Sequence, residues 1–235
     1  MLHRLLLILL IGFVPFVNAE SDLPDCPVDQ PWVFDNCIST FTLSDGSEYV
    51  GEVNDTGMHG QGTLTTADGY NASRKLLLAR RLIEAGVRVV SVSFSDFDTH
   101  RRNFSRMRHL VPVVDHALAT LVSDLHERGM LDDVTIVAWG EFGRSPKVNK
   151  DGGRDHWPRV SPAILAGGGM NVGQLIGATD KHAGEATARP VHYQDVMATL
   201  YQNLGLPPRA TTITDITGRP QYLCDTGRPI RELVG

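Results

Sequence analysis

The sequence has few cysteines, no block of basic residues and, beyond its first residues, no long apolar run. Only three of the 235 residues are cysteine, and no Cys-x-x-Cys spacing occurs, which argues against a metal site built from cysteines. Lysine and arginine are scattered and the formal net charge is -5, so the composition does not indicate a nucleic-acid partner. The length and the 42% hydrophobic content are typical of one medium globular domain, or of a small module followed by a domain.

The only long apolar run lies at the N-terminus, over residues 5–17, behind the short positive end Met1-Leu2-His3-Arg4. Val17 and Ala19 occupy the two positions that a signal peptidase reads. The pattern predicts a signal peptide over residues 1–19 and a secreted or periplasmic protein with no transmembrane segment after cleavage. The alternative is a membrane anchor, for which the run is short because a bilayer span takes about 20 residues.

The cysteines fit an oxidising compartment. Cys26 and Cys37 are close in the chain, and a disulfide between them would close a short loop. Cys224 is left without a partner by this pairing.

Residues 20–70 have the composition of short strands and turns. The phrase Asp45-Gly46 recurs as Asp68-Gly69, each copy next to a strand-like segment, and such repetition is typical of a repeat array. Tyr49-Val50-Gly51-Glu52, followed by a glycine-dense turn over residues 57–62, resembles a MORN repeat. The resemblance implies a β-hairpin module that contacts protein or lipid, although about one and a half repeats leave little surface to bury.

Residues 71–235 read as an α/β domain with a mostly parallel sheet and flanking helices. The periodicity predicts helices over 73–86, 104–128 and 193–204, and strands over 87–94, 134–139 and 161–166. The 134–139 segment is a largely apolar run, which is typical of a buried strand. In this fold class the functional loops lie at the carboxyl ends of the strands.

Polar side chains gather at those predicted loops. Carboxylates mixed with imidazoles are the ligands of divalent ions such as zinc, manganese or calcium, and arginines beside them would steady an anion. The candidate ligands are Asp98, His100, Glu141, Asp155 and His156, and the candidate anion-binding residues are Arg144 and Arg154.

Each candidate also has an interpretation that involves no metal. Asp98 could cap the helix that follows its loop, and Glu141 could simply pair with Arg144. Asp155 could pair with an arginine while His156 is structural. These alternatives stay open at the level of sequence.

Four stretches, taken in order, resemble the C-terminal half of a bacterial secreted family called domain of unknown function 1501. They are LARRLIEAGVR at 78–88, DTH at 98–100, GEFGRSP at 140–146 and GRDHWP at 153–158. The resemblance runs from about residue 73 to the C-terminus. It places the chain with the sulfatase and alkaline-phosphatase superfamily, and so implies divalent-metal binding at the residues above and action on a small phosphate or sulfate ester.

The resemblance also shows what this chain departs from. In that superfamily an earlier strand supplies a metal-binding aspartate and a hydroxyl or thiol nucleophile, and no such pattern precedes residue 73. The sequence therefore predicts a signal peptide over 1–19, a MORN-like module over 20–70 and a half-domain over 71–235. The alternative function is a secreted binding or interaction protein without catalysis.

Overall fold

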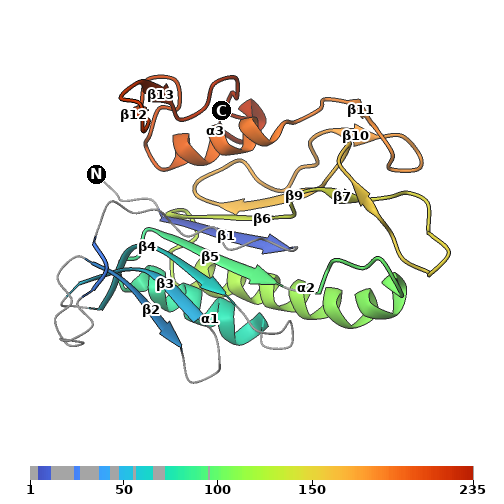
Figure 1. Cartoon of the computed structure of the whole chain (residues 1–235), viewed down its shortest axis with the longest axis horizontal. Coiled ribbons are helices and arrows are strands. Elements are labelled where there is room, and N and C mark those ends of the chain that lie inside the picture. The colour runs from blue at the N-terminus through green and yellow to red at the C-terminus, as the bar shows by residue number, and fades with distance from the viewer. Residues whose placement is uncertain are drawn as a thin grey trace.

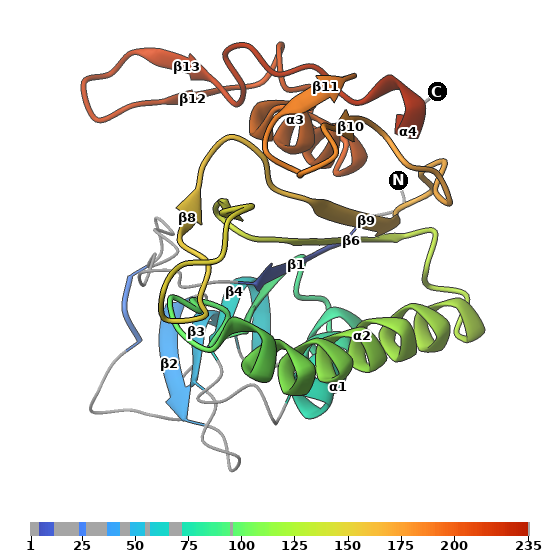
Figure 2. The same ribbon diagram turned by 90° about the vertical axis from the view of Figure 1, so that its right-hand side faces the viewer.

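A computed structural model places helices on both faces of a mixed β-sheet (Figures 1 and 2). The structure describes residues 5–11, 24–26, 37–42, 48–54, 57–65, 72–94 and 96–234. Its helices are α1 (Ala72–Glu84), α2 (Asn103–Glu127), α3 (Tyr193–Asn203) and α4 (Arg231–Val234). Within these residues, no helix is both long enough and apolar enough to cross a bilayer.

The main sheet has seven strands and both kinds of pairing. In spatial order they are β2 (Cys37–Thr42), β3 (Glu48–Asn54), β4 (Gly57–Thr65), β5 (Val89–Phe94), β1 (Leu5–Ile11), β6 (Val134–Trp139) and β9 (Ala163–Gly167). The pairings β4–β5, β5–β1 and β1–β6 are parallel, whereas β2–β3, β3–β4 and β6–β9 are antiparallel. The α/β class is thus confirmed, but a mostly parallel sheet is not.

Three two-stranded ladders complete the structure. They are β7 (Gly143–Arg144) with β8 (His156–Trp157), β10 (Ala178–Thr179) with β11 (Ala186–Ala188), and β12 (Thr212–Thr214) with β13 (Pro220–Tyr222). All three are antiparallel. The first of them carries part of the candidate site.

One face of the main sheet packs on α1 and α2. Burial alternates along β5, as expected of a strand whose side chains point to opposite faces in turn. Buried residues of this core include Leu76, Ala79, Leu82 and Ile83 of α1, Val90, Val92 and Phe94 of β5, and Ala117, Leu121 and Leu125 of α2. The spacing of the α2 residues puts them on one side of that helix.

The opposite face packs on α3 and α4 near β6 (Figure 2). Val137 of β6 belongs to this second core, together with Val196, Leu200 and Leu233 of the two helices. Ile136, the neighbour of Val137, faces the first core. Both faces of β6 are therefore covered, which explains why five of its six residues are apolar.

The apolar N-terminal run supplies an interior strand of the sheet, the fifth of the seven in spatial order. β1 lies between β5 and β6, and Leu6 is paired with Val89 on one side and Thr135 on the other. Most of the predicted signal peptide and its cleavage position at Ala19 lie outside the described residues. Signal cleavage stays a prediction, but the same segment has a place in the folded sheet.

The segment assigned to a MORN-like module forms the antiparallel meander β2–β3–β4. Cys26 and Cys37 are joined by a disulfide, the pair that the spacing suggests. The predicted Asp-Gly turns at 45–46 and 68–69 lie outside the described residues. β4 is hydrogen-bonded to β5, so strands from 20–70 and from 71–235 share one sheet; the MORN assignment itself stays a prediction.

Candidate metal centre

The site lies at the edge of the sheet where β5 and β6 both end. These strands run parallel to β1 and hence to each other, so the segments that follow them start from the same edge. The β5 segment carries Asp98 and His100, and the β6 segment leads into β7 with Arg144. Because β7 pairs with β8, His156 stands opposite Arg144 in the ladder.

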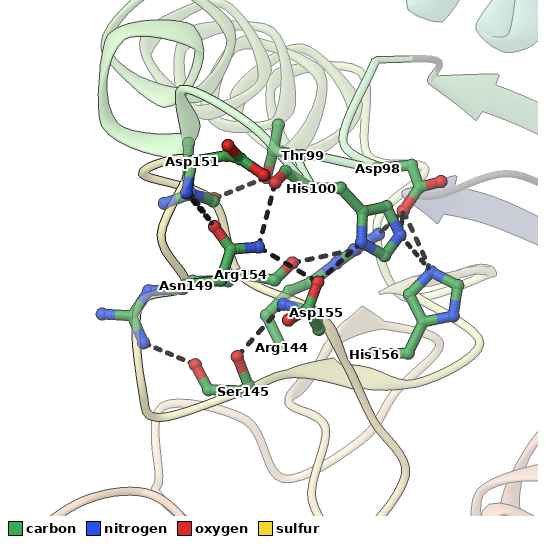
Figure 3. Close-up of polar contacts among 12 residues, drawn as sticks. Asp98, Thr99, His100, Arg144, Ser145, Asn149, Asp151, Arg154, Asp155 and His156 are labelled. Atoms are coloured by element: carbon green, nitrogen blue, oxygen red, sulfur yellow. Dashed lines mark hydrogen bonds and ion pairs between the residues drawn. The ribbon is translucent and has the colours of Figure 1, made fainter.

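Asp98, His100 and His156 point toward one another and bring three ligand atoms together (Figure 3). Asp98 Oδ1 lies 3.1 Å from His100 Nε2 and 3.0 Å from His156 Nε2. The two Nε2 atoms are 3.0 Å apart. Ligands bound at about 2.0–2.2 Å to one zinc ion lie roughly 3 to 3.5 Å from each other, so this triangle has the size that a single ion requires.

Asp155 fixes the orientation of His100 and is not a member of the triangle. Its Oδ1 lies 2.9 Å from His100 Nδ1 and accepts a second hydrogen bond, of 3.1 Å, from Asn149 Nδ2. The network assigns the proton to Nδ1, which leaves the Nε2 lone pair facing Asp98 and His156. The hydrogen bonds from His100 and Asn149 hold the pKa of the Asp155 carboxyl below its usual range.

Asp98 is contacted by three groups through the same oxygen. Besides the two imidazoles, Arg144 Nη2 donates to Oδ1 over 2.5 Å. Burial raises the pKa of the Asp98 carboxyl, but hydrogen bonds from Arg144 and His156 outweigh it and leave that pKa below its usual range. The Asp98, His100 and His156 side chains are 42%, 44% and 47% exposed, so a small solute can reach them.

The two candidate arginines differ in what they contact. Arg154 Nη1 donates to the backbone carbonyls of Ser145 and Pro146 over 2.6 and 2.8 Å, and its guanidinium lies 5.7 Å from the centre of the Phe104 ring. Arg154 therefore ties loops together. Arg144 donates to Asp98 and, over 3.2 Å, to the carbonyl of Arg154, which holds its guanidinium beside the triad.

Glu141 lies outside the triad, although its segment follows β6 as predicted. It lines a small pocket of about 130 Å³ next to Arg144, with Phe97, Thr99, Asn103, Met107 and Phe142. Within the described part of the chain, Glu141 is exposed and is not among the side chains that could share an ion with Asp98. The ring of Phe142, which also lines this pocket, lies 4.1 Å from the ring of His156.

Two loops are joined by backbone hydrogen bonds so that the ligands meet. Arg154 N donates to the Thr99 carbonyl over 3.0 Å, and Asn103 N donates to the Gly152 carbonyl over 2.9 Å. A Cβ on Gly153 would lie 1.9 Å from the carbonyl oxygen of His100, so only glycine permits this approach. The glycine in the GRDH stretch is thereby explained by packing of the two loops.

The backbone is held in unusual conformations on either side of the Asp98 loop. Asp96 and Arg102 have φ of 72° and 50°, in the left-handed region that non-glycine residues rarely adopt. Thr99, which is buried, donates to Asn103 Oδ1 over 2.5 Å and so anchors the loop to the first turn of α2. Positive φ at such residues is common where a loop is held for binding.

Sequence reasoning missed Asn149 and Asn103. Asn149 Nδ2 donates to the His100 carbonyl as well as to Asp155, and its Oδ1 accepts from the backbone N–H groups of Asp151 and Gly153. One signal for it existed, because asparagine side chains commonly bond the backbone two residues on, and Asn149 stands three residues before Gly152-Gly153. Asn103 offered only its place at the start of a predicted helix.

A protein-family model described as "Protein of unknown function (DUF1501)" matches residues 45–234. The match confirms the resemblance to that family and includes the whole candidate site. It begins at residue 45 and not near 73, so β3 and β4 are part of the matched region as well. No curated protein matches the chain. Neither the sulfatase and alkaline-phosphatase superfamily nor MORN repeats are shown by these comparisons.

Proposed function

We propose that this chain, which belongs to the DUF1501 family, binds one divalent metal ion through Asp98, His100 and His156. The observation that carries the proposal is the convergence of two imidazole nitrogens and a carboxylate oxygen within 3.1 Å of one another. Because Asp155 accepts a hydrogen bond from His100 Nδ1, the Nε2 lone pair of His100 faces the triangle, and loss of the proton that His156 Nε2 donates to Asp98 leaves three acceptors there. A shared cation is what such an arrangement of acceptors needs.

The donor set favours zinc or manganese over calcium. Calcium takes six to eight oxygen ligands, whereas two of the three donors here are imidazole nitrogens. Three protein ligands on an exposed edge leave further coordination positions open, which is the pattern of a catalytic rather than a structural site. Asp98 offsets part of the ion's charge, and Asp155 keeps the His100 ring in place.

We further propose that the bound partner is a small phosphate or sulfate ester, in keeping with an origin in the sulfatase and alkaline-phosphatase superfamily. Arg144 supports this, because a guanidinium next to the triad offers paired N–H donors to an oxyanion. A divalent ion in the triad would act as a Lewis acid toward the ester oxygen. The side chains of the site then orient the anion against it.

Binding without turnover is the second candidate, and a specific observation favours it. Thr99 Oγ1 donates to Asn103, and Ser145 Oγ donates to the Lys147 carbonyl over 2.7 Å. Among the described residues, the hydroxyl groups of Thr99 and Ser145 are thus engaged in holding the loops. In the described part of the site, neither hydroxyl is free to act as a nucleophile. A secreted binding protein without catalysis would not need one.

Metal binding is tested by titrating purified protein with zinc and manganese and measuring bound metal after gel filtration. We expect about one equivalent in the unaltered protein. His100→Ala and His156→Ala should each lose it, because each removes one of three ligands. His116→Ala, an exposed position on α2, is the matched control and should bind as before. Variants at 100 and 156 that retain the metal would overturn the proposal.

Turnover is a separate question, which chromogenic aryl phosphate and aryl sulfate esters answer. Hydrolysis that requires the metal and is lost in His156→Ala supports the hydrolase. Metal binding with no hydrolysis of either ester supports the binding protein.

A further inference from the structure

Arg144 and any cation held by the triad depend on the same atom. Arg144 Nη2 donates to Asp98 Oδ1 over 2.5 Å, and this oxygen is also the carboxylate corner of the triangle formed with His100 and His156. The guanidinium is held on its other side by the Arg154 carbonyl. It therefore cannot leave the site without losing a second hydrogen bond.

The charges around this oxygen do not balance once a cation binds. Asp98 and Arg144 neutralise each other, and the Asp155 carboxylate is directed to His100 and Asn149. Of the described residues, Asp98 alone brings a carboxylate into the triad. A divalent ion would add two positive charges beside a guanidinium that is already present, and like charges at such short range repel.

A bound oxyanion would offset the excess positive charge, and its oxygens suit the guanidinium of Arg144. Arginine presents paired N–H donors that match the oxygens of phosphate and sulfate, and its charge persists at any accessible pH. The Arg144 side chain is 20% exposed, so it can meet a solute without leaving its place. Arg154 cannot take this role in the same way, because it donates to two backbone carbonyls.

We propose that the Asp98–Arg144 pair couples the two ligands, so that metal and tetrahedral oxyanion bind synergistically. The inference rests on the proposed metal site and adds that each ligand raises the affinity for the other. Without an anion the guanidinium competes with the metal for Asp98 Oδ1 and repels it. With an anion the guanidinium bonds to the anion instead, and the carboxylate oxygen is released to the metal.

The test is calorimetric titration of the full chain with manganese chloride, in sodium sulfate or in sodium chloride of equal ionic strength. Sulfate should tighten manganese binding by about 5- to 150-fold, the usual range for coupled sites. Because coupling is reciprocal, manganese should tighten sulfate binding by the same factor. Equal ionic strength separates the specific anion from general screening.

Arg144→Ala should abolish the sulfate effect and bind manganese in chloride at least as tightly as the unaltered protein, since a competitor for Asp98 is gone. Arg144→Lys keeps the positive charge but lacks the paired N–H donors, so it should retain only part of the sulfate effect. This variant keeps the test valid if the alanine variant fails to fold. Arg159→Ala is the matched control, because Arg159 is an exposed arginine ion-paired with Glu185, a residue outside the triad. It should keep the full effect.

The outcomes separate this inference from the metal proposal. Manganese binding that is equally tight in sulfate and chloride overturns the coupling and leaves the metal site standing. An Arg144→Ala protein that still shows the full sulfate effect also overturns it. If the unaltered protein binds no manganese or zinc in either salt, both proposals fail.

Discussion

Asp155 shows how one exposed carboxylate can matter to a metal it does not touch. It accepts hydrogen bonds from His100 Nδ1 and Asn149 Nδ2, and Asn149 in turn holds the His100 carbonyl. This arrangement selects the tautomer that presents Nε2 to the triad. The sequence suggested Asp155 as a ligand, whereas its geometry is that of a residue that positions one.

Asp155→Asn should therefore weaken metal binding without abolishing it. An amide oxygen can accept a hydrogen bond from His100 Nδ1–H, but it makes the imidazole a weaker metal ligand. Changes of this kind cost about 10- to 100-fold in metal affinity. Manganese titration measures the effect. Asp151→Asn is the control, because only backbone groups of Asp151 are hydrogen-bonded in the loop. Equal losses in both variants would count against a positioning role.

At the residue scale, the sequence showed which loops meet but not which atoms meet. Asp98 and His100 follow β5 at one edge of the sheet, and the β7–β8 ladder brings His156 to the same place. Glu141 follows the same edge, yet it lines a neighbouring pocket and is not one of the three ligands. Arg144 and Arg154 have similar surroundings in the sequence, and only the fold distinguishes them.

The two loops of the site are held together by close backbone contact, and glycines make that contact possible. Gly153 faces the His100 carbonyl, and a Cβ on Gly143 would lie 1.9 Å from the Val160 carbonyl oxygen. Both glycines belong to the stretches that identified the family from sequence. Their role follows from packing, since neither carries a functional group.

Gly153→Ala should separate the loops and abolish metal binding while leaving the helices in place. The added Cβ would overlap the His100 carbonyl, so the backbone must move and the triangle must open. Gly184→Ala is the control, because the nearest heavy atom to its Cβ would be 3.6 Å away. Circular dichroism and manganese titration of both variants measure the result. Unchanged binding in Gly153→Ala would contradict this account of the loops.

The larger elements could be predicted because their patterns are long. The helices expected over 73–86, 104–128 and 193–204 correspond to α1, α2 and α3, and the apolar strand over 134–139 is β6. β7 and β8 could not be predicted, because two residues are too few to show a period. They form only because Gly143 and the loop over 149–154 bring their backbones together.

At the scale of the whole molecule, the N-terminal segment joins two strands of the main sheet, and its sequence fits two interpretations. A short apolar run behind a positive end predicts a signal peptide, and an apolar run of seven residues also suits a strand at the centre of a sheet. Hydropathy alone cannot distinguish them. In the structure, β1 is the shared neighbour of β5 and β6, the two strands that lead into the site.

Deletion of residues 1–19 should destabilise the fold and weaken metal binding. Without β1, β5 and β6 would lie about 10 Å apart with unpaired backbone groups between them. We expect a lower and broader thermal transition than that of a chain starting at Leu5, which keeps β1. Calorimetry and manganese titration compare the two. A shortened chain that melts at the same temperature and binds manganese equally would show that β1 is dispensable, as signal cleavage requires.

The central claim is that Asp98, His100 and His156 hold one ion, and anomalous diffraction from crystals grown with zinc or manganese tests it most directly. The account predicts one anomalous peak at the triad, about 2.0–2.2 Å from Asp98 Oδ1 and from both Nε2 atoms, with Asp155 still bonded to His100 Nδ1. A crystal that shows no peak at the triad, or whose ion is held by other residues, would contradict it.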